Sequence, residues 1–265
     1  MRWAAVSLVA DNSAIKDLTP DLRSAWENAS GIDTRLNFAL LLANAYRTEE
    51  DGIHLKEIAG EILKSYPDSY TAIGLAASAD EMLKDWDNWK QMLDAQLSKH
   101  PSDESLLRMK TSYYEAHGDW SAARATLQIL FDKGKATATD YNRYAWSALF
   151  DNSVSDDAVK VARQGATLTN NSSFSELHTL ACLYAAQGKT AEARDLLLKT
   201  MLAFNMAVPN EEVWFGYASL YEQYGIDDAA IEAYEKVEKP EGRIGATSTY
   251  QLAQARLKAL KTAHP

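Results

Sequence analysis

The segment from Glu211 to Tyr234, EEVWFGYASLYEQYGIDDAAIEAY, contains the pattern that decides the fold. Large side chains recur three and four residues apart before a glycine, and an alanine and a tyrosine four residues apart follow it. These residues are Trp214, Tyr217, Tyr221, Gly225, Ala230 and Tyr234. Spacings of three and four residues place side chains on one face of an α-helix. The segment therefore predicts two short helices joined by a turn at Gly225.

Segments of the same kind recur along the chain. Pro67 in Ser-Tyr-Pro-Asp and Pro101 in Lys-His-Pro-Ser lie 34 residues apart. Glycine turns at Gly118, Gly188 and Gly225 give an independent marker of the same phase. Together the markers set repeat starts at Leu36, Tyr70, Glu104, Phe174 and Glu211. A further repeat after the one at Glu104 carries Tyr141, Tyr144, Ala145 and Ala148. Several repeats in one phase indicate a repeat architecture, which no single helix pair could do.

These repeats resemble the tetratricopeptide repeat, whose pattern is Trp, then Leu-Gly, Tyr, a later Ala-x3-Phe and a closing Pro. The Phe174 repeat matches it with Leu177, Leu180, Ala181, Tyr184, Ala193 and Leu197. The Leu36 and Tyr70 repeats are more degenerate, and the junctions after the fourth and fifth repeats are longer than usual. The closing proline is kept at Pro67 and Pro101 and comes early at Pro240. The resemblance covers residues 36–240 and implies an all-α fold, a right-handed α-solenoid of about six helix hairpins.

Small residues at two positions of each repeat have a physical reason in this family. The first helix (A) and the second helix (B) of a hairpin cross there, and a larger side chain holds their axes apart. These residues are Ala43, Ala77, Ala145, Ala181 and Ala218 at position 8 of the repeat, and Ala123, Ala193 and Ala230 at position 20. Glycine at position 15 suits a left-handed helix end. Asp119 and Asp227 follow such glycines, and we expect each to cap the next helix. Because a lone hairpin cannot bury both faces, the hairpins must stack.

Residues 1–35 and 241–265 lie outside the six repeats. Residues 1–35 are interpreted as N-terminal helices that form a degenerate repeat or a cap, with one helix starting at Thr19-Pro20, since proline is tolerated in a first turn. An amphipathic pattern from Ile244 to Ala263 predicts a C-terminal capping helix. The first ten residues faintly resemble a signal peptide, but their apolar part is short and Leu8 stands where a small residue is needed. A helix of a truncated preceding repeat is the favoured interpretation.

Composition excludes several classes of partner and site. The formal net charge of −10 repels phosphates, which argues against nucleic acid and against an anionic membrane surface. No run approaches the roughly 18 apolar residues of a membrane helix, so membrane insertion is not expected. The single cysteine, Cys182, excludes an intramolecular disulfide and a multi-cysteine metal site. The compartment stays open, with the cytoplasm favoured over the periplasm.

No catalytic motif stands out. His178 and Cys182 lie four residues apart on one helical face, but two ligands do not make a zinc site. A Gly-rich phosphate loop, a nucleophile elbow and an HExxH sequence are all missing. We therefore expect a protein that is not an enzyme, with no catalytic residues, no metal and no cofactor.

The resemblance implies a binding surface in the concave groove, lined by positions 2, 5, 9, 12 and 13 of the A helices. The candidate binding residues are Asn44, Arg47, Arg108, Ser112, Asn142, Trp146, His178, Phe215 and Ser219. Trp146 is the most informative, because a large apolar residue on a wet face suits an interface anchor. The alternative is that a slipped register places Trp146 in the core. Asn44 is present but the flanking lysines of a carboxylate clamp are not, so chaperone-type recognition is not expected.

The implied function is a scaffold that binds a protein or peptide partner in this groove. Two alternatives remain open at this point. The array can mediate self-association as a homo-oligomer, or it can be the repeat portion of a larger, exported bacterial multidomain protein.

Overall fold

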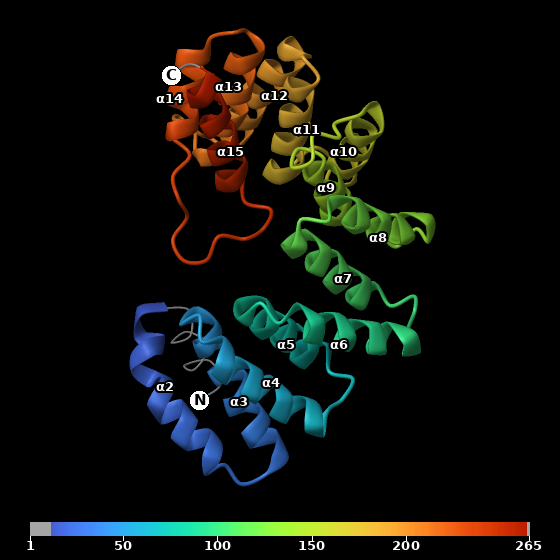
Figure 1. Cartoon of the computed structure of the whole chain (residues 1–265), viewed down its shortest axis with the longest axis vertical. Helices are drawn as coiled ribbons and strands as arrows, with labels where there is room; N and C mark the ends of the chain where they lie inside the picture. Colours follow the sequence, from blue (N-terminus) through green and yellow to red (C-terminus); the bar gives the residue numbers. More distant parts are fainter. Residues whose placement is uncertain (1–11, 264–265) are drawn as a thin grey trace. The chain divides into compact units, whose positions relative to one another are not determined.

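The computed structural model describes residues 12–263, and within them the regular secondary structure is helical, without strands (Figure 1). The chain divides into two compact lobes, and the boundary lies after Met109. In each lobe consecutive helices pack against one another as hairpins. The expectation about residues 1–10 lies outside the described residues.

The N-terminal lobe contains α2 (Asn12–Glu27), α3 (Ile32–Thr48), α4 (Gly52–Ser65), α5 (Tyr70–Leu83), α6 (Trp86–Lys99) and the start of α7 (Glu104–His117). Its core is built around Trp26, Leu42, Leu55 and Ile58. The buried Asp80 carboxylate of α5 meets Lys56 Nζ of α4 at 2.7 Å and accepts a hydrogen bond from Asn88 Nδ2 of α6 at 2.7 Å. Asp80 therefore ties three successive helices together.

The C-terminal lobe continues from Lys110 and is the larger of the two. It contains α8 (Trp120–Asp132), α9 (Ala138–Ser147), α10 (Asp156–Leu168), α11 (Phe174–Ala186), α12 (Thr190–Ala203), α13 (Glu211–Gln223), α14 (Asp227–Glu235) and α15 (Thr249–Ala263). The A helices of its last three repeats are α9, α11 and α13. The last helix, α15, packs against α14 and α13.

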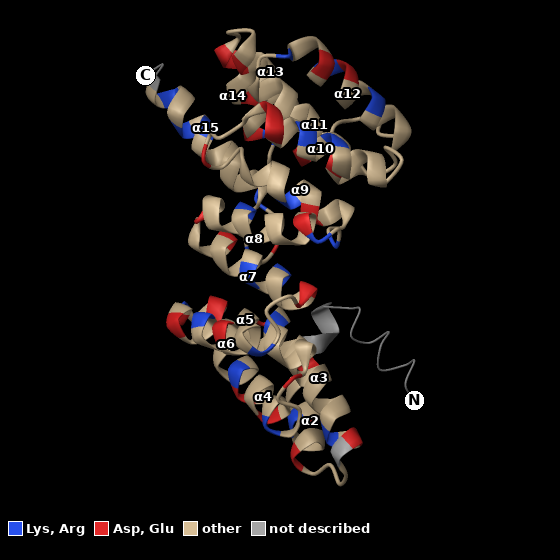
Figure 2. Cartoon of the chain, turned by 90° about the vertical axis from the view of Figure 1, so that its right-hand side faces the viewer, with Lys and Arg blue, Asp and Glu red and all other residues tan. Residues whose placement is uncertain are grey.

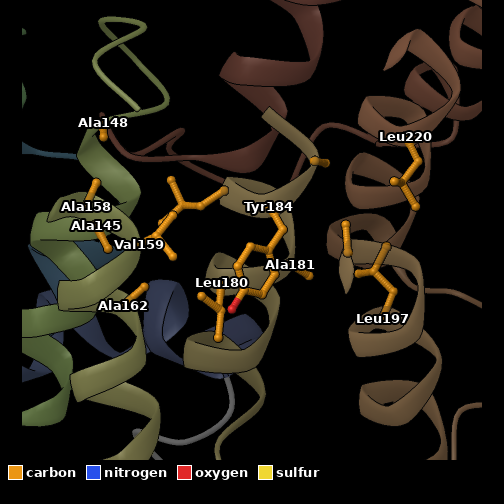
Figure 3. Close-up of a cluster of buried hydrophobic side chains, with 13 residues drawn as sticks. Ala145, Ala148, Ala158, Val159, Ala162, Leu180, Ala181, Tyr184, Leu197 and Leu220 are labelled. Carbon is orange, nitrogen blue, oxygen red and sulfur yellow. The ribbon is translucent and has the colours of Figure 1, made fainter. Parts of the chain in front are cut away.

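The small residues predicted at helix crossings are buried, which confirms the phase of the repeats. All eight have relative exposures of 7% or less. Figure 3 shows Ala145 of α9 beside Ala158 of α10, with Val159 and Ala162 in the same cluster. The register of the fourth repeat therefore holds, although Ala158 arrives one residue late.

The predicted turns are also present. Gly118, Gly188 and Gly225 have φ angles of 73°, 72° and 69°, which is the left-handed conformation that glycine adopts without strain. Asp119 caps α8, and its carboxylate accepts the Ala122 N–H at 3.0 Å. The same expectation for Asp227 is wrong, because Ile226 occupies the N-cap position of α14 and Asp227 lies in the first turn.

Two terminal helices differ from expectation. The helix α2 starts at Asn12, so Pro20 lies inside it and not in its first turn. Proline removes one helical hydrogen bond, but Leu22 and Trp26 pack into the lobe core and hold the helix together. The C-terminal helix starts at Thr249, not Ile244. Gly242 and Gly245 favour loop conformations, and Ser248 Oγ accepts the Tyr250 N–H at 3.2 Å at the start of α15.

Candidate functional site

The candidate surface in the C-terminal lobe is formed by positions 5 and 9 of three successive A helices. These residues are Asn142 and Trp146 of α9, His178 and Cys182 of α11, and Phe215 and Ser219 of α13. We refer to this set as the A-helix face. It contains five of the nine predicted binding residues, and the structure brings three of them, Trp146, His178 and Phe215, into one aromatic cluster.

Trp146 is only 8% exposed and lies at the centre of this cluster. Its ring centroid is 5.4 Å from that of His178 and 5.9 Å from that of Phe215. Its indole Nε1–H donates a hydrogen bond of 2.9 Å to the backbone carbonyl of Thr247, which is 101 residues away in sequence. From sequence, Trp146 was interpreted either as an exposed interface anchor or as a core residue after a slip in register, and neither interpretation is complete. It stays on the A-helix face with no slip in register, and the chain itself covers it.

The covering segment is the α14–α15 loop, residues 236–248, drawn in orange-red in Figure 1. Val237 at its start is buried in the same hydrophobic cluster as Trp146 and Phe215. Leu252 and Leu257 of α15 complete this cluster. The A-helix face is thus an interior surface of this lobe over much of its area.

His178 is buried in this interior, and burial lowers its pKa to about 4. Its Nε2 lies 2.7 Å from the carbonyl oxygen of Glu212. Because a carbonyl can only accept, Nε2 carries the proton of a neutral imidazole. Cys182 Sγ is 3.3 Å from the same nitrogen, and burial raises the pKa of this thiol. A thiol kept in its protonated form is a poor nucleophile, so the pair does not have the chemistry of a catalytic Cys–His dyad.

Close to Ser219, the face is bordered by a hydrogen-bonded ion pair. Arg256 of α15 binds both carboxylate oxygens of Glu222 of α13, at 2.8 and 3.2 Å. Tyr234 of α14 donates to Glu222 at 2.8 Å, and Ser219 Oγ lies 3.3 Å from the same phenol oxygen. The hydrogen bond to Glu222 raises the pKa of Arg256, and burial raises that of Tyr234. These contacts fix α15 onto the last hairpin.

Two hollows adjoin the face. One, of about 220 Å³, lies among α11, α13 and α15, with Cys182, Phe215, Ser219 and Arg256 in its wall. It is smaller than the roughly 300–1,000 Å³ of most small-molecule pockets. The other, of about 620 Å³, lies between the α14–α15 loop and the start of α13. Burial raises the pKa of Glu212, which lines this second hollow beside Glu211.

The predicted residues outside the aromatic cluster have other neighbours. Ser112 of α7 accepts a hydrogen bond of 2.9 Å from Arg143 of α9, so it supports a structural contact. In the N-terminal lobe, the exposed Arg47 guanidinium donates to Asn44 Oδ1 at 2.8 Å, and Arg108 lies 3.7 Å from Glu104 one turn earlier. The buried Oδ1 of Asn142 has no hydrogen-bond partner among the described residues.

Sequence reasoning placed Glu222 at position 12 of the last A helix but did not identify Thr247 or Arg256 as part of this surface. The sequence around Thr247 indicates only a loop, because two glycines and several hydroxyl residues follow the early Pro240. Figure 2 shows Asp and Glu interspersed with Lys and Arg along the helices of each lobe, so charge alone does not mark the face either.

Comparison with solved structures decides the fold. A tetratricopeptide repeat protein from Parabacteroides merdae superposes with a TM-score of 0.66 over 95% of this chain and 96% of its own, at 12% sequence identity. The Cut9–Hcn1 hetero-tetramer of APC/C gives a TM-score of 0.60 over 98% of this chain, at 11% identity. The chain has a tetratricopeptide-type fold. It spans about 46% of the second matched chain.

The tetratricopeptide-type fold predicted from the repeat spacing is thereby confirmed. No protein-family model matches the sequence, and no curated protein is similar to it in sequence. No helix in residues 12–263 combines the length and apolar character of a membrane span. In the same range no group of three or more His, Cys, Asp or Glu side chains is arranged to hold a metal ion.

Proposed function

We propose that this protein is a non-enzymatic scaffold that binds a protein or peptide segment along its A helices. The observation that carries the proposal is the repeat fold itself, because stacked hairpins place equivalent A-helix positions in rows and give an extended surface. A surface of this kind suits an elongated partner better than a metabolite. The hollow of about 220 Å³ beside Ser219 is in keeping with this, since it matches one side chain of such a partner.

The accessible part of the proposed surface lies at the polar candidates. Arg47 is exposed, Arg108 and Asn142 are partly exposed, and Arg is among the residues favoured as interface anchors. Trp146 is a poor residue for a first test, because its truncation leaves a cavity in the core cluster and lowers stability by roughly 3–5 kcal/mol.

The test is affinity capture of partners, identified by mass, with the wild type and the double variant Arg47→Glu, Arg108→Glu. We expect the variant to lose the captured partner while its helicity stays unchanged, since neither side chain is buried. The matched control is the double variant Lys64→Glu, Lys99→Glu, an equal charge reversal at exposed positions of α4 and α6, which are B helices. Equal capture by all three proteins contradicts the proposed surface.

A second candidate function, self-association, is favoured by an exposed apolar segment. In the last turn of α12 and the connection to α13, Leu202 and Val208 are 78% and 71% exposed, and Phe204, between them in sequence, is also exposed. Apolar side chains clustered at a surface mark interaction sites. Light scattering over a range of concentrations tests this, with Leu202→Ser and Val208→Ser as the variants. A monomeric mass at every concentration removes this candidate.

A further inference from the structure

A hollow of about 210 Å³ lies in the N-terminal lobe, where α2 and α4 both pack against α3. Its apolar wall is formed by Trp26 of α2, Leu36 and Ala39 of α3, and Ile62 of α4. Leu36 and Ala39 are positions 1 and 4 of the first repeat. The hollow is therefore not part of the concave groove, which positions 2, 5, 9, 12 and 13 line.

The size of this hollow suits a small molecule with one apolar group. A protein cavity of about 150 Å³ takes up a benzene molecule. A hollow of about 210 Å³ therefore holds a phenyl or isobutyl group together with the atoms that carry it. A second hollow of about 520 Å³ shares Leu36, Ile62 and the exposed Tyr66 with it. Through this second hollow, a ligand can reach the apolar wall from solvent.

Four polar side chains also line the hollow, and each has a group without a partner among residues 12–263. Arg35 forms no ion pair there, and the hydroxyl groups of Ser65 and Tyr66 form no hydrogen bond. Glu61 binds Lys64 through Oε1 alone. In the hollow of about 220 Å³ in the C-terminal lobe, by contrast, the charged side chains bind each other. The polar groups of the N-terminal hollow are available to a ligand.

Arg35 is held at the hollow without being neutralised. Its guanidinium carbon lies 4.9 Å from the centroid of the Trp26 ring, a cation–π contact that leaves its N–H groups unused. Arg23 lies over the same ring at 5.3 Å, but it is paired with Glu27 and Glu57. Arg35 is the fourth residue of α3, near the positive end of the helix dipole, where a cation is unfavourable. Helix stability therefore gives no reason for an arginine at this position.

Glu61 supplies a negative charge to the same hollow. It lies near the end of α4, at the negative end of that helix dipole. The hydrogen bond from Lys64 lowers the pKa of Glu61, and the charge of Arg35 lowers it further. Arg35 and Glu61 nevertheless form no ion pair with each other. The hollow thus has a positive side at the start of α3 and a negative side at the end of α4.

A ligand that matches this hollow carries an anionic, a cationic and an apolar group close together. A carboxylate fits the forked guanidinium of Arg35, and an ammonium group fits Glu61. A purely anionic ligand is repelled by Glu61 and by the net charge of −10, whereas a zwitterion has no net charge. An α-amino acid with an apolar side chain carries all three groups on one carbon atom.

We propose that this hollow of the N-terminal lobe is a binding site for a free α-amino acid with an apolar side chain of leucine to phenylalanine size. The ligand carboxylate binds Arg35 and the ligand ammonium binds Glu61. The ligand side chain packs against Trp26, Leu36 and Ile62. This site goes beyond the proposed scaffold function and uses none of the residues of the A-helix face.

Isothermal titration calorimetry of the full chain with L-leucine and L-phenylalanine tests the site. Isocaproate is leucine without its ammonium group, and isoamylamine is leucine without its carboxylate. Each should bind roughly ten- to hundredfold more weakly than L-leucine, because it lacks one charge-assisted contact. Glycine, without the apolar group, should also bind more weakly. No binding of either amino acid at millimolar concentration, or equal binding of L-leucine and isocaproate, overturns the proposal.

Two variants assign the two charged contacts. In Glu61→Gln, L-leucine should bind no better than isocaproate, and in Arg35→Gln no better than isoamylamine, since each variant removes the partner of one ligand charge. The matched control is Lys90→Gln, an equal loss of charge at an exposed position of α6 outside the hollow. It should bind all ligands like the wild type. Wild-type affinity for L-leucine in Arg35→Gln also overturns the proposal.

The indole N–H resonance of Trp26 locates the ligand independently of these variants. In protein labelled with ¹⁵N-tryptophan it is assigned by its loss in Trp26→Phe. L-leucine should shift this resonance and leave that of Trp214, in the C-terminal lobe, unchanged. Shifts confined to other tryptophans contradict the site. Partner capture with the Arg47→Glu, Arg108→Glu variant changes no residue of the hollow, so the scaffold function is decided separately.

Discussion

Acidification should destabilise the C-terminal lobe through His178. The pKa of this imidazole is lowered from 6.5 to about 4 by burial. At pH 5 an unfolded histidine is about 97% protonated and His178 in the folded state about 10%. The unfolded state thus binds more protons, so the stability contributed by neutral His178 is present above pH 6.5 and is lost as pH falls towards 4.

The expected loss in the free energy of unfolding at pH 5 is about 2 kcal/mol. The full pKa shift allows a loss of about 3 kcal/mol, which is reached when the pH lies below both pKa values. The assay is urea denaturation followed by circular dichroism at pH 7 and pH 5. His178→Gln is the test variant, because glutamine can still donate to the Glu212 carbonyl but does not titrate in this range. Carboxylates titrate equally in both proteins, so the difference between them isolates His178.

The control is His117→Gln, at an exposed position near the end of α7 in the same lobe. It should keep the full pH dependence of the wild type, while His178→Gln loses about 2 kcal/mol of it. Direct titration of the His178 ring by NMR is the measurement that can refute this account. If the His178 ring titrates near 6.5, or if His178→Gln and wild type lose stability equally, the A-helix face is not the covered interior described above.

The remaining predictions concern packing and a partly buried ion pair. Gly216→Ala in α13 should lower the unfolding free energy by about 1–2 kcal/mol, because its new Cβ meets Leu197 Cδ2 at 2.9 Å. Gly60→Ala in α4, where a Cβ meets nothing within 4 Å, should instead raise it by about 0.5–1 kcal/mol; thermal melts of both variants check the opposite signs. Arg143→Ala leaves the buried Glu115 carboxylate without its two hydrogen bonds, of 2.6 and 3.1 Å, and should cost about 2–3 kcal/mol in denaturant titration. Stability equal to the wild type in that variant contradicts the structural role of the pair.

The fold could be predicted from the sequence because it depends on local and repeated constraints. Ala145, Ala181 and Ala218 are small for a reason that applies in every hairpin, and the glycine turns mark the same phase independently. Because each repeat shows the same pattern, the prediction of the fold becomes stronger with every repeat. Asp227 was misplaced because a one-residue shift at a helix end changes little in the periodic pattern and is decided by tertiary packing. Pro20 was misplaced because proline is typical of a first turn, whereas α2 runs from Asn12 through Pro20.

The candidate site could be predicted only in part. Position 9 of the fourth repeat placed Trp146 on the A-helix face, and the structure keeps it there. The sequence did not show that Thr247 returns to the same place, because that contact joins residues 101 apart and has no periodic signature. The predicted groove residues His178 and Phe215 are buried for the same reason. A loop that folds back leaves no trace in repeat spacing.

The reactivity of Cys182 tests the covered face most directly. It is the only cysteine of the chain, it is 1% exposed on the A-helix face, and burial raises the pKa of its thiol. The measurement is the rate at which a thiol reagent such as dithiobis(nitrobenzoate) reacts with the native chain and with the chain in denaturant. We predict native reaction slower by roughly 100-fold or more, since the thiol reacts only through opening. Reaction of the native chain at the denatured rate contradicts a covered A-helix face.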